Sequence, residues 1–263
     1  MHPLVKKTIL INGHNLNLEH SGPEDGPVVI LLHHGLGSVR AWRGQVSPLV
    51  EAGYRVVSYD RWGYGGSDPR PGLDVPAFTT DVNDLEALMD ELNIEQAALV
   101  GHSDGGTIAL YFASRQPQRV KHLVTVAAHI YVEPEMEPGI LGLREAFETD
   151  ERFQTGMKLV HGEKYESVFY NWFNGWHRQE SLNWDMRPLL RRIECPVLVV
   201  QGELDEYASL QHARDISKSI PGAELWILPG AKHMLPQENP VEFNSIVLGY
   251  LNMNTVTRSI EVA

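Results

Sequence analysis

Cysteine is almost absent from this chain of 263 residues, because Cys195 is the only one. A single cysteine cannot form a disulfide within the chain, and it cannot supply the several thiolates of a cysteine-based metal cluster. Cys195 stands between Glu194 and Pro196, directly before a run of Val and Leu residues. We therefore expect it to be a buried residue at the start of a strand rather than a nucleophile.

Basic residues are also scarce. The chain has 22 Lys and Arg against 34 Asp and Glu, which gives a formal net charge of -12. No cluster of basic residues is larger than the pair Lys6-Lys7. A protein of this charge repels phosphate backbones and anionic lipid, so we expect neither nucleic acid nor a membrane among its partners.

Long hydrophobic runs and metal-binding motifs are missing as well. No segment approaches the ~20 apolar residues that a membrane-spanning helix needs, and residues 1–10 lack the basic region and apolar stretch of a secretion signal. No H-E-x-x-H motif or Cys/His ligand spacing occurs, so no metal site is expected. We expect a soluble, cytoplasmic protein, and we see no linker that would divide it into two independent domains.

What the sequence does have is a regular alternation of short apolar runs and longer amphipathic stretches. Runs rich in Val, Ile and Leu, which are typical of buried strands, lie at 28–32, 55–59, 97–100, 120–126, 197–200 and 225–228. Helical spacing is found at 79–93, 104–116, 207–220 and 239–252, and more weakly at 39–52. Residues 4–11 and 14–20 predict an N-terminal hairpin. The order predicts an α/β fold with a mostly parallel, twisted sheet of about eight strands flanked by helices.

The alternation is interrupted between about 130 and 190. Pro134 and Pro138 introduce a segment without a strand pattern, and aromatic residues then recur at helical spacing from Tyr165 to Trp176. We interpret residues 133–188 as a helical cap inserted into a core formed by residues 1–132 and 189–263. Most of the aromatic stripe is expected to pack on the core, with one or two rings as candidates for the roof of a pocket.

The strongest local motif is Gly101-His102-Ser103-Asp104-Gly105-Gly106. It directly follows the predicted strand at 97–100 and directly precedes a predicted helix. A strand that ends at a glycine-flanked serine and opens a helix forces a tight turn, because the glycines allow the chain segments to approach closely. Ser103 is then left protruding as a candidate nucleophile. The simpler interpretation is an ordinary strand-to-helix turn.

The same turn offers hydrogen-bond donors for an oxyanion. The backbone N–H of Asp104 and the positive end of the following helix point toward the oxygen that becomes negative when a carbonyl is attacked. A second donor must come from another loop, and His34-Gly35-Leu36 follows the strand at 28–32. We predict that it is the N–H of Leu36, because Gly35 allows this amide to turn inward.

A serine hydroxyl is a weak nucleophile until a base removes its proton, and the base needs an acid to orient it. Among twelve histidines, His233 lies in the loop after the last predicted strand, at the edge of the sheet where Ser103 also lies. Asp205 follows the strand at 197–200 and completes the chain order Ser, Asp, His. We therefore predict a Ser103, His233 and Asp205 triad.

Other residues compete for these roles. Glu203 and Glu206 are alternative acids beside Asp205. The remaining histidines are expected to be surface or hydrogen-bonded residues, and they include His33, His129, His161 and His177.

Five landmarks resemble the α/β-hydrolase superfamily in identity and in order. They are His34-Gly35, the DRWGYGGS segment at 60–67, Gly101 to Gly106, Gly202 to Asp205, and Gly230 to His233. The resemblance implies an α/β-hydrolase fold over nearly the whole chain. It also disfavours the epoxide hydrolases and haloalkane dehalogenases of the superfamily, because these have aspartate at the position of Ser103.

Shorter stretches are similar to the valacyclovirase-like (biphenyl-hydrolase-like) esterases. They are Ser103 to Gly106, Tyr165 to Trp176, Lys232-His233 and Glu242 to Asn244. This resemblance implies substrates that are α-amino-acid esters, whose ammonium group is held near the nucleophile.

Asp104 is informative about the substrate. An anion about 6 Å from a developing oxyanion would oppose it by ~3 kcal/mol at an effective dielectric near 20, roughly a hundredfold in rate. Two arrangements avoid this penalty. The carboxylate can turn aside and serve the helix N-terminus, or a substrate cation can pair with it.

The motifs favour hydrolysis of a small carboxylic ester, amide or lactone through an acyl-serine intermediate, without a cofactor. The same triad could instead cleave a carbon-carbon bond next to a ketone or form peracids, because the difference lies in the shape of the pocket. A ligand-binding protein that has lost turnover is a third hypothesis, and the intact Ser103, Asp205 and His233 argue against it.

Overall fold

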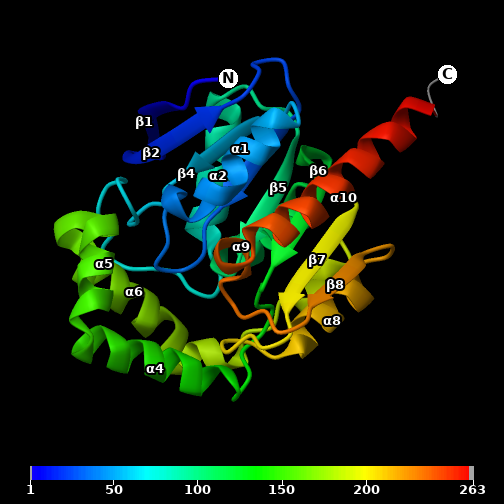
Figure 1. The fold of residues 1–263 in the computed structure, drawn as a ribbon. Coiled ribbons are helices and arrows are strands. Elements are labelled where there is room, and N and C mark those ends of the chain that lie inside the picture. The colour runs from blue at the N-terminus through cyan, green and yellow to red at the C-terminus, as the bar shows by residue number, and fades with distance from the viewer. Residues whose placement is uncertain (1, 261–263) are drawn as a thin grey trace.

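The computed structural model of the protein describes residues 2–260. For residues 179–180 and 253–260 it describes the backbone but not the side chains. Residues 1 and 261–263, the two ends of the predicted core, lie outside this range. Eight strands form one sheet in the order β1-β2-β4-β3-β5-β6-β7-β8 (Figure 1). Their bounds are β1 Val5–Ile11, β2 His14–Ser21, β3 Val28–Leu32, β4 Arg55–Tyr59, β5 Ala97–His102, β6 Val120–Val126, β7 Val197–Gly202 and β8 Glu224–Leu228.

The direction of the strands agrees with the predicted fold class. β2 is antiparallel to its neighbours β1 and β4, and the other strands pair in parallel. The prediction of a mostly parallel sheet of about eight strands is therefore confirmed. Because parallel strands end at the same edge, the loops after β3, β5, β6, β7 and β8 meet there.

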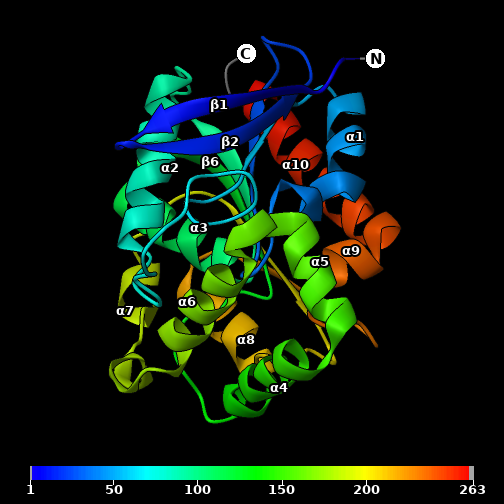
Figure 2. The ribbon, with the colours of Figure 1, turned by 90° about the vertical axis from the view of Figure 1, so that its left-hand side faces the viewer.

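Helices cover both faces of this sheet. The α-helices are α1 Arg43–Glu51, α2 Thr79–Glu91, α3 Asp104–Arg115, α4 Met136–Thr149, α5 Glu151–His161, α6 Tyr165–His177, α7 Arg187–Leu190, α8 Leu210–Ser219, α9 Leu235–Glu238 and α10 Pro240–Ile260. Short 3-10 turns lie at Val39–Trp42, Pro117–Arg119, Gly162–Lys164 and Gln179–Asn183. Figure 2 shows α1, α9 and α10 on one side of the sheet, and α2 and α3 on the other.

Alternation along the buried strands produces two apolar layers. In β3, Val29 and Leu31 belong to the cluster that contains residues of α1 and α10. Ile30 and Leu32 belong to the cluster that contains residues of α2, α3 and α8. This alternation with apolar residues on both faces explains why the strand reads as a continuous hydrophobic run.

The helix predicted at 207–220 begins later, at Leu210. The carboxylate of Asp205 accepts hydrogen bonds from the backbone N–H groups of Tyr207 and Ala208, so these residues form a turn around Asp205. Ser209 then caps the helix by accepting from the N–H of Gln211. The predicted start of this helix at residue 207 was wrong. Hydrophobic periodicity does not show that the carboxylate of Asp205 binds the backbone N–H groups of Tyr207 and Ala208 and so keeps them out of the helix.

Three helices, α4, α5 and α6, follow β6 and lie at one end of the sheet (Figures 1 and 2). We call them the cap helices, and we propose residues 133–188 as the cap. The aromatic stripe of α6 is largely buried, and Phe169 stacks on Phe147 of α4 with ring centroids 3.9 Å apart. Much of the stripe thus packs within the cap itself, whereas Trp172 and Trp176 line a cavity above the core.

Cys195 is 8% exposed and lies two residues before the start of β7. The expectation of a buried residue is confirmed, and burial raises the pKa of its thiol to about 12. Within residues 2–260, no helix is both long and apolar enough to cross a membrane.

Candidate active site

Ser103 occupies the turn between β5 and α3 in a strained conformation. Its φ is 54° and its ψ is -121°, a region that costs a non-glycine residue about 1–3 kcal/mol and persists only where the surroundings enforce it. The surroundings are close backbone contacts: a Cβ on Gly105 would overlap the carbonyl of Leu32, and a Cβ on Gly101 would overlap the carbonyl of Gly105. An ordinary strand-to-helix turn needs no such strain, so this geometry supports a functional role for Ser103.

His233 and Asp205 are in direct contact. Nδ1 of His233 lies 3.0 Å from Oδ1 and 2.9 Å from Oδ2 of Asp205. Asp205 also accepts from the side-chain amide of Gln201 at 2.7 Å. Burial alone would raise the pKa of Asp205, but His233 and the N–H of Tyr207 lower it below its ordinary value. A carboxylate that stays ionised keeps a proton on Nδ1 of His233 and leaves Nε2 free to act as a base.

The alternative acids do not contact the imidazole ring. Glu203 accepts a hydrogen bond from the backbone N–H of Gly230. Glu206 accepts one from the backbone N–H of His233. Both glutamates therefore hold the loop that carries His233, while Asp205 alone of the three acids touches its ring.

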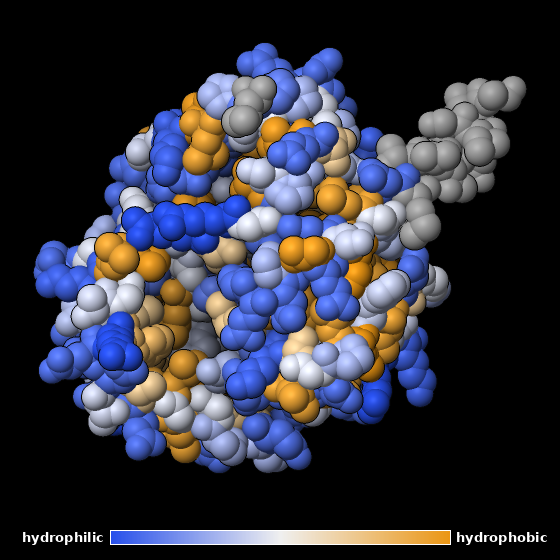
Figure 3. Space-filling model, in the orientation of Figure 1, coloured by the Kyte–Doolittle hydropathy of each residue, from blue (hydrophilic) through white to orange (hydrophobic). Residues whose placement is uncertain are grey.

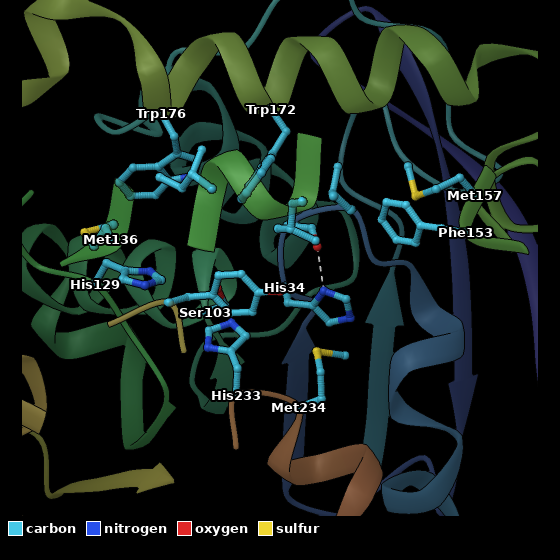
Figure 4. Close-up of a pocket in the computed structure, with 15 residues that line it drawn as sticks. His34, Ser103, His129, Met136, Phe153, Met157, Trp172, Trp176, His233 and Met234 are labelled. Carbon is cyan, nitrogen blue, oxygen red and sulfur yellow. Dashed lines mark hydrogen bonds between the residues drawn. The ribbon is translucent and has the colours of Figure 1, made fainter. Parts of the chain in front are cut away.

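Ser103 and His233 line the same cavity (Figure 4). The neighbouring residue His102 strengthens this arrangement, because its Nε2–H donates to the carbonyl of His233 at 2.9 Å. The side chain next to the candidate nucleophile thus anchors the loop of the candidate base.

The two predicted oxyanion donors, the N–H groups of Leu36 and Asp104, lie in the loop after β3 and at the start of α3. Gly35 and Leu36 line the cavity beside Ser103, and Leu36 has a φ of 59°. Its carbonyl accepts from Nε2–H of His161 at 2.9 Å, and Nδ1 of the same ring accepts from the N–H of Gly65 at 2.9 Å. His161, the last residue of cap helix α5, therefore fixes the peptide that follows the predicted oxyanion donor. Asp104 is the first residue of α3, where a backbone N–H has no partner within the helix.

The carboxylate of Asp104 adopts neither of the two arrangements that the sequence suggested. It is 1% exposed and does not line the cavity. Its Oδ2 lies 3.4 Å from the guanidinium of Arg61, and its Oδ1 accepts from the indole of Trp176 at 3.3 Å. Gly35 covers it, since a Cβ on Gly35 would lie 2.9 Å from Oδ2. The carboxylate of Asp104 is therefore not placed to contact a substrate in the cavity. The buried guanidinium of Arg61 compensates its charge.

Arg61 belongs to a larger buried ion-pair chain. It lies 3.2 Å from Asp81, and Asp81 lies 2.9 Å from Arg70. These three groups and Asp104 carry two positive and two negative charges, and each side chain is at most 3% exposed. Burial raises the pKa of Asp104, and Arg61 opposes part of this rise. A buried charge is tolerated when it is paired in this way.

The cavity between the core and the cap helices has a volume of about 290 Å³. Figure 3 shows the molecular surface hollowed beside these helices, with apolar residues at the hollow. Most lining residues are apolar, and no Lys, Arg, Asp or Glu is among them: His34, Gly35, Leu36, Ser103, His129, Met136, Ile140, Leu143, Phe153, Met157, Trp172, Trp176, Tyr207, His233 and Met234. Within the described part of the chain, no group of three or more His, Cys, Asp or Glu residues could hold a metal ion.

Several histidines of the core and of the cap helices are deeply buried. Burial lowers the pKa of His34 and of His161 to about 4, and that of His129 to about 3. It also lowers the pKa values of His33 and His102 well below the ordinary value. At neutral pH these rings are uncharged, and two of them, His34 and His129, line the cavity.

Sequence reasoning missed Arg61, His102 and the role of His161. Arg61 is part of the DRWGYGGS landmark, which follows the predicted strand at 55–59. This loop lies at the carboxyl edge of the sheet, so its position indicates that Arg61 could reach the site. His102 adjoins the nucleophile in the motif itself. His33 and His161 are hydrogen-bonded, as expected, and His177 is exposed.

The buried neutral histidines predict a loss of stability in mild acid. The pKa of His161 falls from 6.5 to about 4 on folding. Between these values the unfolded chain binds more protons, so the free energy of unfolding decreases as the pH falls, by ~1.4 kcal/mol per pH unit for each such histidine. Above about pH 6.5 this contribution is absent, and below about pH 4 the slope ends because both states are protonated.

Urea unfolding of the wild type and His161→Asn, from about pH 7.5 to about pH 5, checks this effect. The variant loses hydrogen bonds to Leu36 and Gly65 and should be less stable at every pH, but its stability should depend less steeply on pH, by ~1 kcal/mol per unit. His177→Asn, at an exposed position of α6, is the matched control. Equal slopes for the wild type and His161→Asn would contradict the prediction.

Comparisons of this chain with known proteins identify its family. Serine hydrolase BPHL from Homo sapiens is 32% identical over 249 residues, which cover 92% of this chain and 85% of that protein. 2-Hydroxy-6-oxo-6-phenylhexa-2,4-dienoate hydrolase from Comamonas testosteroni is 28% identical over 258 residues, with 86% and 88% covered. A solved hydrolase from Pseudomonas aeruginosa PA01 has a TM-score of 0.76 at 25% identity and covers 94% of this chain and 98% of that one. Residues 27–183 match the family model of the alpha/beta hydrolase fold, and the chain therefore belongs to the α/β-hydrolase family.

Proposed function

We propose that this protein is a serine hydrolase that cleaves small, uncharged carboxylic esters through an acyl-Ser103 intermediate. The observation that carries the proposal is a single cavity wall containing Ser103 on its strained turn and His233 in contact with Asp205. Membership of the family supports hydrolysis in general.

In the proposed reaction, Ser103 Oγ attacks the ester carbonyl while Nε2 of His233 takes its proton. Asp205 holds the other ring nitrogen and stabilises the imidazolium that forms. The N–H groups of Leu36 and Asp104 bind the oxygen that becomes negative. His233 then protonates the departing alkoxide, and the same ring activates the water that cleaves the acyl-serine.

The lining of the cavity supports an uncharged ester over an anionic ketone substrate. The relative from Comamonas testosteroni is named for a dienoate, which carries a carboxylate. A carboxylate transferred into an apolar cavity needs a cation or several donors to replace its hydration. No Lys or Arg lines this cavity, and His34 and His129 have pKa values of about 4 and about 3, so they supply no positive charge at neutral pH.

Reaction with a fluorophosphonate tests whether the serine is activated. We expect stoichiometric labelling at Ser103 in the folded wild type, and none in Ser103→Ala. Ester hydrolysis should fall by several orders of magnitude in Ser103→Ala and by roughly 10⁴-fold in Asp205→Asn, because the imidazole would adopt the wrong tautomer. Glu203→Gln is the matched control and should stay within a few-fold of the wild type.

The outcomes separate the alternatives. A wild type that is not labelled would contradict the proposal and favour a binding protein on the same fold. An Asp205→Asn protein of unchanged rate would show that another acid orients His233.

The Asp104-Arg61 pair predicts how the enzyme responds to substrate charge. Because Arg61 compensates Asp104, an ammonium group on the substrate gains little, and benzyl esters of alanine and of propionic acid should have kcat/KM values within about threefold of each other. At a pH where Asp104 stays ionised, Arg61→Met should leave its charge uncompensated, lower kcat for the propionate by up to about a hundredfold and favour the alanine ester by roughly tenfold. The double variant Arg61→Met/Asp104→Asn should return the ratio toward that of the wild type.

Fluorophosphonate labelling of each variant confirms that the site is folded. A strong preference of the wild type for the alanine ester, removed by Asp104→Asn alone, would contradict the neutral-substrate proposal. It would instead support the amino-acid esters that the sequence resemblance implies.

A further inference from the structure

The predicted oxyanion donor Leu36 has a left-handed backbone conformation. Its φ is 59°, in a region that is unfavourable for a residue with a side chain because Cβ crowds the following carbonyl oxygen. Such a conformation persists only where the surrounding contacts impose it. The contacts that hold the two peptide planes on either side of Leu36 therefore also hold the direction of its N–H group.

Each of these two peptide planes is in contact with a histidine ring. On one side, the carbonyl of Gly35 accepts from Nδ1–H of His34 at 2.5 Å. Because this peptide is trans, the Gly35 carbonyl and the Leu36 N–H point in opposite directions, so holding the carbonyl orients the N–H. On the other side, the carbonyl of Leu36 accepts from Nε2–H of His161 at 2.9 Å. The N–H of the same plane, that of Gly37, donates to the carbonyl of His34 at 3.2 Å.

His161 is the one of these partners that comes from the cap helices. His34 and Gly37 belong to the loop that follows β3, whereas His161 is the last residue of α5. The carbonyl of Leu36 is thus held from outside its own loop. A movement of α5 would remove this contact while leaving the contacts within the loop in place.

The partners of His161 fix its tautomer as well as its position. Nδ1 of the ring accepts from the backbone N–H of Gly65 at 2.9 Å. A backbone N–H can only donate and a carbonyl can only accept, so the ring is neutral and carries its proton on Nε2. His161 is 3% exposed, and its ring meets that of Tyr64 edge-on with centroids 6.1 Å apart. The donor to Leu36 therefore has a fixed place and a fixed protonation state.

One face of α5 connects this contact with the cavity. Phe153, Met157 and His161 follow one another at intervals of four residues, so their side chains lie on the same face of the helix. Phe153 and Met157 line the cavity, and Figure 4 shows both on the same side of Ser103 as His34. The helix face that borders the substrate space is thus also the face that holds the loop of the predicted oxyanion donor.

We propose that His161 is a positioning residue through which cap helix α5 holds the predicted oxyanion donor Leu36 in place. With α5 docked on the core, the peptide planes on both sides of Leu36 are held. When α5 moves away, the Leu36 carbonyl loses its partner and the strained residue relaxes, which turns its N–H away from the oxyanion. The oxyanion site is therefore complete only while the cap is closed over the substrate. This inference rests on the proposed function and concerns how its site is assembled.

Replacement of His161 separates this role from a general contribution to folding. His161→Leu removes the donor to Leu36 and should lower kcat for p-nitrophenyl butyrate by about tenfold or more. KM should stay within about threefold, because an oxyanion donor acts mainly in the transition state. His161→Gln places an amide N–H near the position of Nε2 and should recover most of the lost kcat. His161→Met, which keeps the length of the side chain without a donor, gives the same test if His161→Leu does not fold.

Arg40→Met is the matched control. Its guanidinium donates to the carbonyl of Leu159 at 3.2 Å, so this variant removes another hydrogen bond between the core and α5 without touching Leu36. Its kcat should stay within about threefold of the wild type, because His161 still holds the Leu36 carbonyl.

A trifluoromethyl ketone measures the same effect in binding. Ser103 Oγ adds to the carbonyl of 1,1,1-trifluoroheptan-2-one, and the tetrahedral adduct carries a negative oxygen like that of the transition state. Its inhibition constant should rise by about tenfold or more in His161→Leu and stay near the wild-type value in Arg40→Met. The alcohol 1,1,1-trifluoroheptan-2-ol forms no adduct, and its inhibition constant should be the same in all three proteins.

The outcomes distinguish this role from the proposed function. Near-ultraviolet circular dichroism shows whether each variant is folded. A folded donor-free variant with unchanged kcat and unchanged affinity for the ketone would overturn the positioning role and leave the proposed function standing. Equal losses in His161→Leu and Arg40→Met would also overturn it. A wild type that neither reacts with a fluorophosphonate nor hydrolyses esters would overturn the proposed function and this role with it.

Discussion

The packing of the turn at Ser103 against the end of β3 is the steric constraint on which the candidate site depends. Gly105 lies so close to the carbonyl of Leu32 that no side chain fits there. This contact drives Ser103 into its positive-φ conformation and starts α3 directly beneath Gly35. The candidate nucleophile and the predicted oxyanion donors are therefore positioned by backbone contacts, which are more rigid than side-chain hydrogen bonds.

The same constraint forces a charge into the interior. Because α3 begins at Asp104 under Gly35, its carboxylate cannot reach water, and the structure compensates it with Arg61. Arg61 in turn contacts Asp81 and stacks over the ring of Tyr64 at 4.4 Å. Breaking such a pair is costly because it leaves an uncompensated buried charge. Compensation by Arg61 weakens the field of the Asp104 carboxylate at the candidate nucleophile Ser103.

Much of the fold could be predicted from the sequence, because strand and helix periodicities and the glycine-flanked serine are local features. The loops after β5, β7 and β8 could be placed at one edge from the parallel order alone, which predicted Ser103, Asp205 and His233 as neighbours. The partner of Asp104 could not be predicted this way, since Arg61 lies 43 positions earlier in the chain and only the folded packing brings the two together. The start of α8 was also set by a side chain, Asp205, that captures nearby N–H groups.

The histidines show why burial had to come from the structure. From sequence, His33, His129 and His161 were equivalent, yet the fold gives His33 and His161 hydrogen bonds that hold loops and places His129 in the cavity wall. Burial also lowers the pKa values of all three, and because His129 is the one of them that lines the cavity, its ring adds no positive charge to the wall at neutral pH. A hydrogen bond in an apolar cavity discriminates strongly, because a ligand that lacks the matching group leaves a buried polar atom unpaired. The uncharged substrate that we propose for this cavity therefore requires no charged residue in the wall.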